Sequence, residues 1–120
     1  MKYLVDSNII IYHLNQESIA TQFLRDHYQE IAISQITFIE VLSFEFSEMV
    51  EKDIRTLLST FTILDVTHNI ANQAISNRKI KKIKIPDNLI ASTAMVHDLI
   101  LVTRNVKDFN TLDIKILNPF

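Results

Sequence analysis

The chain has no glycine among its 120 residues, and this absence limits the turns that it can form. Glycine is the residue that enters the left-handed backbone region without a steric cost. Asparagine and aspartate must therefore supply any left-handed backbone positions. We expect that role for the asparagines near segment ends, namely Asn8, Asn15, Asn77, Asn105 and Asn110.

The same absence excludes several kinds of site. P-loops, dinucleotide-binding turns and the nucleophile elbow of α/β-hydrolases all need glycine for close backbone approach or for a strained turn. The chain also lacks cysteine, so no disulfide framework exists. The histidines are isolated and have no cysteine partner, which argues against a zinc site; they are His13, His27, His68 and His97.

Short apolar runs alternate with helical patterns along the chain. The expected strands are Lys2–Val5, Ile31–Ile33, Thr62–Val66, Leu99–Thr103 and Ile114–Leu117. The expected helices are Ile9–Leu14 with Asn8 as its cap, Glu17–Tyr28, Ile36–Met49, Glu51–Phe61, Ile70–Ile80 and a helix opened by Pro86 that runs to about His97. Continuous apolar strands that alternate with helices indicate an α/β fold, with a parallel sheet covered on both faces.

Length and composition predict one domain over residues 1–120, because 48% of the residues are hydrophobic. No apolar run approaches the length of a membrane span. The N-terminus meets Asp6 too early for a secretory signal, so we expect a cytoplasmic protein. The net charge is −2, so binding to nucleic acid would require positive charge gathered in one place.

Acidic and amide side chains gather near the ends of the expected strands. Asp6 ends the first strand, Asp87 stands in the first turn of a helix, and Asn105 and Asp108 follow the fourth strand. Ligands of open α/β sheets bind beyond the carboxyl ends of the strands. Taken singly, Asp6 reads as a turn or helix cap, Asp87 as a favourable charge at a helix N-terminus, and Asp108 as a surface acid.

Glu40 is the most informative acid, because it lies on a strongly apolar helix. Ile36, Ser43 and Phe44 share its face at helical spacing, so its carboxylate should be partly buried. Such a group needs a cation. That cation is either a Lys or Arg partner or a divalent metal shared with Asp6 and Asp87, since Mg²⁺ and Mn²⁺ prefer oxygen ligands.

Four segments of the sequence form a recognisable set of motifs. They are Val5-Asp6-Ser7-Asn8, Thr37-Phe38-Ile39-Glu40-Val41, the run from Ile85-Pro86-Asp87 to Ala94, and the run from Thr103-Arg104-Asn105 to Asp108-Phe109. They resemble the motifs of the PIN-domain family, and of its VapC-type toxins in particular. The closing Asn118-Pro119-Phe120 fits the same pattern. The order and spacing agree over essentially the whole chain.

The resemblance implies a three-layer, Rossmann-like fold with a mainly parallel sheet of four to five strands. It also implies a Mg²⁺- or Mn²⁺-dependent endoribonuclease with one or two ions, the toxin of a type II toxin–antitoxin pair, with RNA as substrate. The family's first three acids fall on Asp6, Glu40 and Asp87. Its fourth position is often aspartate but here is Asn105, for which Asp108 is a substitute.

For this chemistry we expect Asp6, Glu40, Asp87 and Asp108 to hold the metal, with Asn105 also in the catalytic site. The Ser7 and Thr103 hydroxyls are candidates to orient those ligands, or are ordinary strand-end hydroxyls. A cognate antitoxin is the expected partner, and the apolar helix Ile36–Met49 suggests a homodimer and an antitoxin groove. That helix could equally be central to the core.

A basic run precedes Asp87 and holds five of the twelve Lys and Arg residues, namely Arg78, Lys79, Lys81, Lys82 and Lys84. It is either a phosphate-tracking edge for RNA or a solvated helix end.

Two further functions stay open. One is a PIN fold that binds RNA or a partner without cleavage, as the change at Asn105 suggests. The other is a receiver-like phospho-acceptor domain, which is ranked last because Asp6 has no adjacent acid.

Overall fold

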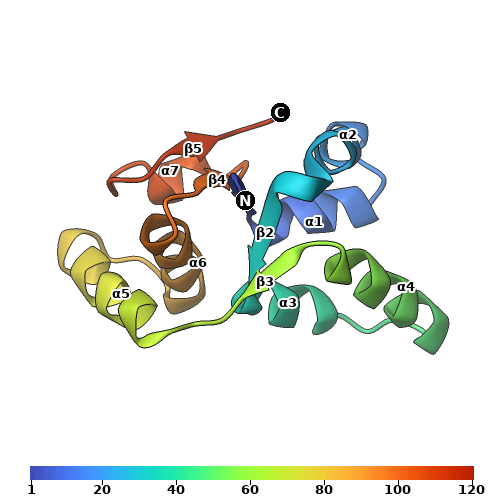
Figure 1. The fold of residues 1–120 in the computed structure, drawn as a ribbon, viewed down its shortest axis with the longest axis horizontal. Helices are drawn as coiled ribbons and strands as arrows, with labels where there is room; N and C mark the ends of the chain where they lie inside the picture. The colour runs from blue at the N-terminus through green and yellow to red at the C-terminus, as the bar shows by residue number, and fades with distance from the viewer.

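A computed structural model describes residues 1–120 and shows a central sheet between two layers of helices (Figure 1). The strands are β1 (Tyr3–Val5), β2 (Ile31–Ser34), β3 (Thr62–Leu64), β4 (Ile100–Val102) and β5 (Ile116–Leu117). The helices are α1 (Ser7–Leu14), α2 (Ser18–His27), the 3₁₀ turn η1 (Tyr28–Glu30), α3 (Gln35–Leu42), α4 (Glu48–Ser59), α5 (His68–Ile80), α6 (Ile85–Val96) and α7 (Val106–Phe109).

All five strands are parallel, in the order β3-β2-β1-β4-β5. Tyr3 of β1 pairs with Ile31 on one side and with Ile100 on the other. The chain builds outward from β1 to β3, and then returns to β1 to add β4 and β5. The order therefore reverses between β1 and β4, and in such sheets that point is where ligands bind.

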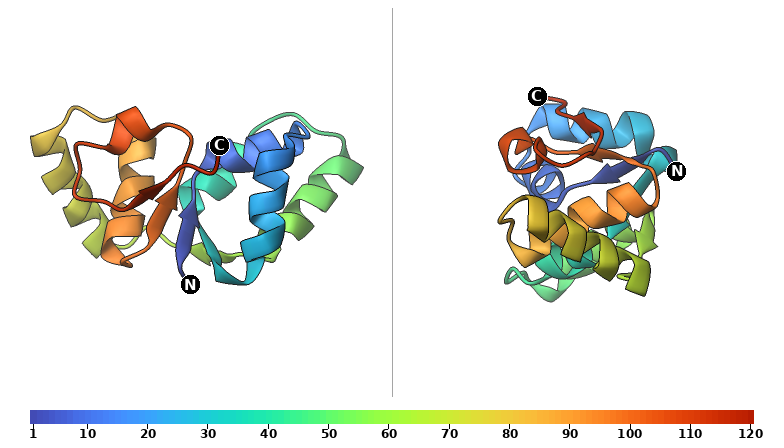
Figure 2. Two further views of the ribbon diagram at one scale, coloured as in Figure 1. Left: turned by 90° about the horizontal axis from the view of Figure 1, so that it is seen from above. Right: turned by 90° about the vertical axis from the view of Figure 1, so that its left-hand side faces the viewer.

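Both faces of the sheet are buried, as the continuous apolar strands predict. Tyr3 and Val5 point into a core shared with α1, α2 and α4, whereas Leu4 points into a second core with α6 and Phe109. Figure 2 shows the resulting layers, with α5 and α6 on one side of the sheet and α1 to α4 on the other. The predicted three-layer α/β fold with a parallel sheet is confirmed.

The predicted helix Ile36–Met49 is wrong. Helix α3 ends at Leu42, and α4 begins at Glu48 after a cap in which Ser47 Oγ accepts a hydrogen bond from Val50 N at 3.2 Å. The two aromatic residues between these helices, Phe44 and Phe46, therefore belong to neither helix.

Two predictions about local backbone are also wrong. The cap of α1 is Asp6 rather than Asn8, because the Asp6 carboxylate accepts from the first N–H of the helix. The left-handed positions are Gln16, at φ 65°, and Asp98, at φ 53°, so the prediction that asparagine or aspartate fills them holds at Asp98 and fails at Gln16. None of the five asparagines named above has a positive φ.

No helix of the structure has the length and hydropathy needed to cross a membrane.

Candidate active site

Asp6 is a buried carboxylate at the carboxyl end of β1, with only 6% of its surface exposed. One oxygen accepts from Ser7 N at 2.7 Å, and the other accepts from the Thr103 hydroxyl at 2.8 Å. No Lys, Arg or His pairs with it, since the structure has four salt bridges and none involves Asp6. The hydrogen bonds satisfy the oxygens, but no positive charge balances the buried anion.

Thr103 joins this carboxylate to the strand beside it. Thr103 follows β4 directly and is fully buried. Its hydroxyl donates a hydrogen bond to Asp6 and accepts one from Asn105 N at 3.0 Å. Asp6 N in turn donates to Val102 O at 2.9 Å. The ends of β1 and β4 are thus tied together at the point where the strand order reverses.

Glu40 reaches the same region from α3. Its Oε1 accepts from the Ser7 hydroxyl at 2.6 Å, and the Ser7 oxygen also lies 3.0 Å from the buried Thr37 hydroxyl. Glu40 is half-buried, as predicted, and takes part in no salt bridge. The Lys or Arg partner that the sequence left open is therefore absent.

Asp87 completes the acidic group from the first turn of α6. The pKa of Asp6 is raised to about 6, chiefly by burial; the Thr103 and Ser7 hydrogen bonds oppose this rise, and the charges of Asp87 and Glu40 add to it. Burial also raises the pKa of Asp87, with the charges of Glu40 and Asp108 adding to it and Lys84 opposing it. The acids are near enough to repel one another.

The acids do not form a closed ligand cage, because no group of three His, Cys, Asp or Glu side chains is gathered at metal-binding distance. The donor set nevertheless fits a hard divalent cation in kind. It offers carboxylate oxygens, and the buried Asp6 charge has no other cation to balance it.

A pocket of about 360 Å³ lies beside Asp87 and Asp108 and combines both signs of charge. Its lining residues are Lys81, Lys82, Ile83, Lys84, Asp87, Asn105 and Asp108. Within it, Asn105 Nδ2 donates to Asp108 Oδ2 at 2.7 Å. Three residues of the predicted basic run therefore lie beside the acids, as their sequence position suggested.

The other two residues of the basic run lie elsewhere. Arg78 donates to the carbonyl of Ile83 at 3.1 Å, and so folds the turn between α5 and α6. Arg78 and Lys79 line a separate, mainly apolar groove of about 470 Å³.

A buried amide network near Asp87 was not anticipated from the sequence. Asn77 of α5 is fully buried and donates to Asn88 Oδ1 at 3.1 Å and to Ser92 Oγ at 3.0 Å, while Asn88 donates to Ala74 O at 2.9 Å. The network fastens the start of α6, which carries Asp87, to α5. Its signal in the sequence is the pair Asn88 and Ser92, one helical turn apart on a mainly apolar helix.

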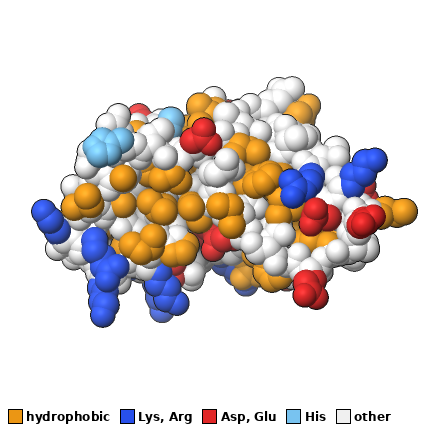
Figure 3. All heavy atoms as spheres, turned by 90° about the horizontal axis from the view of Figure 1, so that it is seen from below, with side chains coloured by type: hydrophobic (Ala, Val, Ile, Leu, Met, Phe, Trp, Pro, Cys, Tyr) orange, Lys and Arg blue, Asp and Glu red, His pale blue; other side chains and the backbone are white.

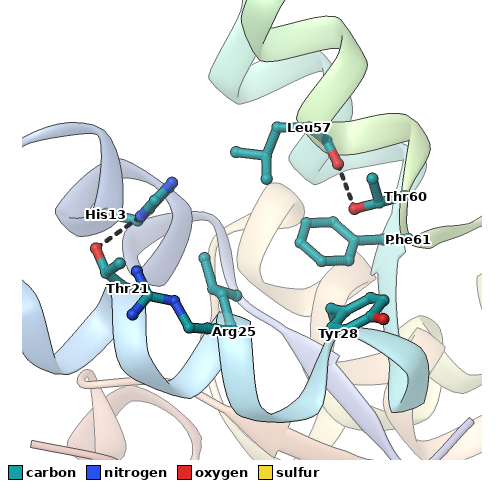
Figure 4. Close-up of a pocket in the computed structure, with 8 residues that line it drawn as sticks. His13, Thr21, Arg25, Tyr28, Leu57, Thr60 and Phe61 are labelled. Atoms are coloured by element: carbon teal, nitrogen blue, oxygen red, sulfur yellow. Dashed lines mark hydrogen bonds between the residues drawn. The ribbon is translucent and has the colours of Figure 1, made fainter.

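A further pocket lies between α1, α2 and α4, away from the acids (Figure 4). His13 lines it and bonds the Thr21 hydroxyl at 2.7 Å. Burial, followed by the charge of Arg25, lowers the pKa of His13. Its lining residues include no acid and no second histidine, so it offers no set of side chains for a divalent metal.

Comparison with known proteins agrees with this reading of the fold. The PIN domain model matches residues 3–115. A chain of a toxin–antitoxin complex from Klebsiella pneumoniae is 35% identical, with a TM-score of 0.89, over 99% of this chain and 98% of that one. A chain of VapBC2 from Rickettsia felis, bound to a DNA fragment from their promoter, is 25% identical with a TM-score of 0.83, over 98% of each chain. No curated protein matches.

The family match covers β1 to β4 and therefore every acid described above. The predicted resemblance to VapC-type toxins is supported by full-length matches to chains of toxin–antitoxin complexes. The chain belongs to the PIN domain family.

Proposed function

We propose that the chain is a Mg²⁺- or Mn²⁺-dependent endoribonuclease that serves as the toxin of a type II toxin–antitoxin pair. The observation that carries the proposal is Asp6, a buried carboxylate without a positive partner at the reversal point of a parallel sheet. Desolvating such a charge costs several kcal/mol unless a cation balances it. The family supports the same reading, because PIN domains are generally nucleases.

Asp6 and Asp87 are the proposed metal ligands, with Glu40 either as a third ligand or as the group that orients a bound water. A divalent ion, when bound, supplies an acidified water and neutralises charge on the phosphate. The Ser7 hydroxyl fixes the Glu40 carboxylate, and the Thr103 hydroxyl fixes that of Asp6. These hydroxyls orient the acids toward a shared ion.

Lys82 and Lys84 supply the positive charge that an acidic protein needs in order to hold RNA. Both line the pocket beside Asp87 and are exposed. A phosphate in this pocket would meet these lysines beside Asp87, one of the proposed metal ligands. The local charge therefore favours a polyanion although the net charge is −2.

RNA cleavage by Asp6→Asn, Glu40→Gln and Asp87→Asn variants tests the proposal. Wild-type protein should cleave RNA only with Mg²⁺ or Mn²⁺, and each variant should stay folded and lose cleavage. Asp26→Asn is the matched control, since Asp26 is an exposed acid on α2. Normal cleavage by Glu40→Gln in the presence of metal would show that the site is wrongly assigned.

A second candidate is a PIN fold that binds RNA or a partner without cleaving it. Asn105 favours this candidate, because a neutral amide stands where the family often has a negatively charged aspartate. The amide nitrogen of Asn105 also donates a hydrogen bond to Asp108. RNA binding without metal, unchanged in Asp6→Asn and with no product formed, would select this candidate.

The toxin role rests on the likeness to chains from toxin–antitoxin complexes. A small open reading frame beside the gene should then encode a protein that binds this chain and suppresses its nuclease activity. Co-expression of the two, followed by purification through one partner, tests this. Failure of the neighbouring product to bind would remove the toxin role while leaving the nuclease proposal intact.

The proposed homodimer now rests on a different surface from the helix that first suggested it. Ile75 and Ile85 are 56% and 58% exposed beside the apolar groove between α5 and α6. Seen from below, hydrophobic side chains gather at this end of the molecule, with lysine and arginine at the rim (Figure 3). Light scattering should give a dimer that Ile75→Glu converts to a monomer, and a monomeric wild type would refute it.

A further inference from the structure

Lys81 differs from the other lysines of the basic run because its ammonium group is already engaged by the protein. Its Nζ donates to the carbonyl of Lys107 at 2.9 Å and to that of Asp108 at 2.8 Å. Both carbonyls belong to α7, and their residues lie 26 and 27 positions after Lys81 in the chain. Lys81 itself is half-buried at the end of α5. The two bonds therefore join the α5–α6 turn to α7.

Helix α7 has little else to hold it in place. It is four residues long, which is far too short for a helix to be stable by itself. Neither of the two carbonyls that Lys81 binds accepts a hydrogen bond from a backbone N–H. The backbone hydrogen bonds that close this turn run from Asp108 N to Asn105 O at 3.2 Å and from Asn110 N to Val106 O at 3.0 Å. Phe109 anchors one side of α7 in the core. Lys81 supplies the donors on the other side, where a cation near helix carbonyls is favourable.

The segment held in this way carries Asn105 and Asp108. Asp108 faces Asp87 closely enough for its charge to act on that carboxyl, and Asn105 is bonded to Asp108. Loss of the tether would leave Phe109 and the Thr103–Asn105 bond as the main links between α7 and the rest of the site.

We propose that Lys81 is a positioning residue, which clamps α7 so that Asp108 and Asn105 stay beside Asp87, rather than a residue whose main role is to bind RNA phosphate. The part of this proposal that concerns metal and RNA rests on the proposed function above. The clamp itself does not. The basic run therefore contains two roles. Arg78 and Lys81 donate hydrogen bonds to backbone carbonyls, whereas Lys82 and Lys84 line the pocket without such bonds.

Lys82 provides a matched control, because it lines the same pocket and has the same charge. Its ammonium group makes no hydrogen bond or salt bridge in the structure. Lys81→Met and Lys82→Met remove one positive charge each and keep the aliphatic stem. Lys81→Arg keeps the charge and the N–H donors and should rescue the loss in Lys81→Met.

Hydrogen exchange of the full chain without metal or RNA tests the clamp directly. Amides of α7 should exchange about tenfold faster in Lys81→Met than in wild type, as expected for the loss of charge-assisted hydrogen bonds. They should be unchanged in Lys82→Met and largely restored in Lys81→Arg. Equal exchange of α7 in wild type and Lys81→Met would overturn the proposal, whatever the nuclease assays show.

Mn²⁺ titration and the salt dependence of RNA binding separate the two roles. Lys81→Met should raise the half-saturating Mn²⁺ concentration by about tenfold. It should leave unchanged the salt slope, which is the slope of the logarithm of RNA affinity against the logarithm of salt concentration. Lys82→Met should leave Mn²⁺ binding unchanged and lower the salt slope by about one. A lower slope with unchanged Mn²⁺ binding in Lys81→Met would return Lys81 to the phosphate-binding group. If wild type binds neither Mn²⁺ nor RNA, the proposed function fails, and hydrogen exchange still decides the clamp.

Discussion

The Ser7 hydroxyl donates to Glu40 Oε1 at 2.6 Å, across 33 positions of sequence. Ser7 begins α1 directly after Asp6, and Glu40 lies on α3. This bond joins the helix that follows β1 to the helix that follows β2. It is also the only side-chain hydrogen bond that Glu40 makes, so it fixes the direction of the Glu40 carboxylate.

Ser7→Ala should therefore weaken cleavage without unfolding the protein. Groups that orient metal ligands typically contribute 10- to 100-fold to affinity or activity, and we expect a loss of about that size. Ser43→Ala is the matched control, because Ser43 bonds only to the Ile39 carbonyl on the exposed part of α3. Unaltered rates and metal affinity in Ser7→Ala would mean that Glu40 does not depend on this hydroxyl.

The pKa of Asp6 predicts how the stability of the metal-free protein depends on pH. The folded value of about 6 lies above the unfolded value of 3.8, so the folded state holds its proton more tightly. The stabilisation is complete below pH 3.8 and is lost as the pH rises through 6, by about 3 kcal/mol in all.

Urea unfolding in a chelator at pH 4.5 and pH 7.5 measures this effect. Asp6→Asn should unfold at higher urea than wild type at the higher pH and lose that advantage at the lower one. Excess Mg²⁺ should stabilise wild type but not the variant, by linkage. Parallel pH profiles for the two proteins would show that the Asp6 carboxylate is not held at a raised pKa.

Removal of the Asn77 amide should destabilise the fold beside Asp87. Its N–H₂ bonds Asn88 and Ser92 inside the α5–α6 contact, and a buried polar group left without its partner costs about 1–3 kcal/mol. Asn77→Ala should lower the free energy of unfolding by about that amount in urea, whereas Asn72→Ala, at an exposed position on the same helix, should not. Equal stability of the two variants would contradict a structural role for the network.

The change at the fourth acidic position leads to opposite predictions for two variants. Asn105 offers a neutral oxygen and donates to Asp108. Asp108→Asn should raise the metal concentration needed for half-maximal cleavage, because it removes a negative charge that acts on Asp87, and Asn105→Asp should lower it. Metal titrations that superimpose for both variants would show that neither residue contributes to metal binding.

The fold could be predicted because strand and helix periods differ clearly in this chain. The apolar runs around Leu4, Ile33 and Leu101 became the three central strands. The prediction of one helix over Ile36–Met49 is wrong because it follows the apolar content of the segment and neglects the signals of two serines. Ser43 bonds the Ile39 carbonyl at the end of α3, and Ser47 caps α4. Serine that competes for backbone groups is an end signal.

The placement of the acids could be predicted only in part. Strand ends located Asp6, and helical spacing located Glu40 in a half-buried position. The bonds from Ser7 to Glu40 and from Lys81 to α7 depend on how helices far apart in sequence pack against each other. Local pattern carries no information about such pairs, so the division of labour within the basic run emerges only from the structure.

The central place of β1 has a consequence for how the molecule is made. Strand β1 is synthesised before β2 and β4, with which it pairs, and the Thr103 hydroxyl bonds Asp6 across 97 positions. Contacts of such long range form late, since their loop-closure entropy must be overcome first. A nascent chain halted before residue 103 thus lacks one wall of the carboxylate site.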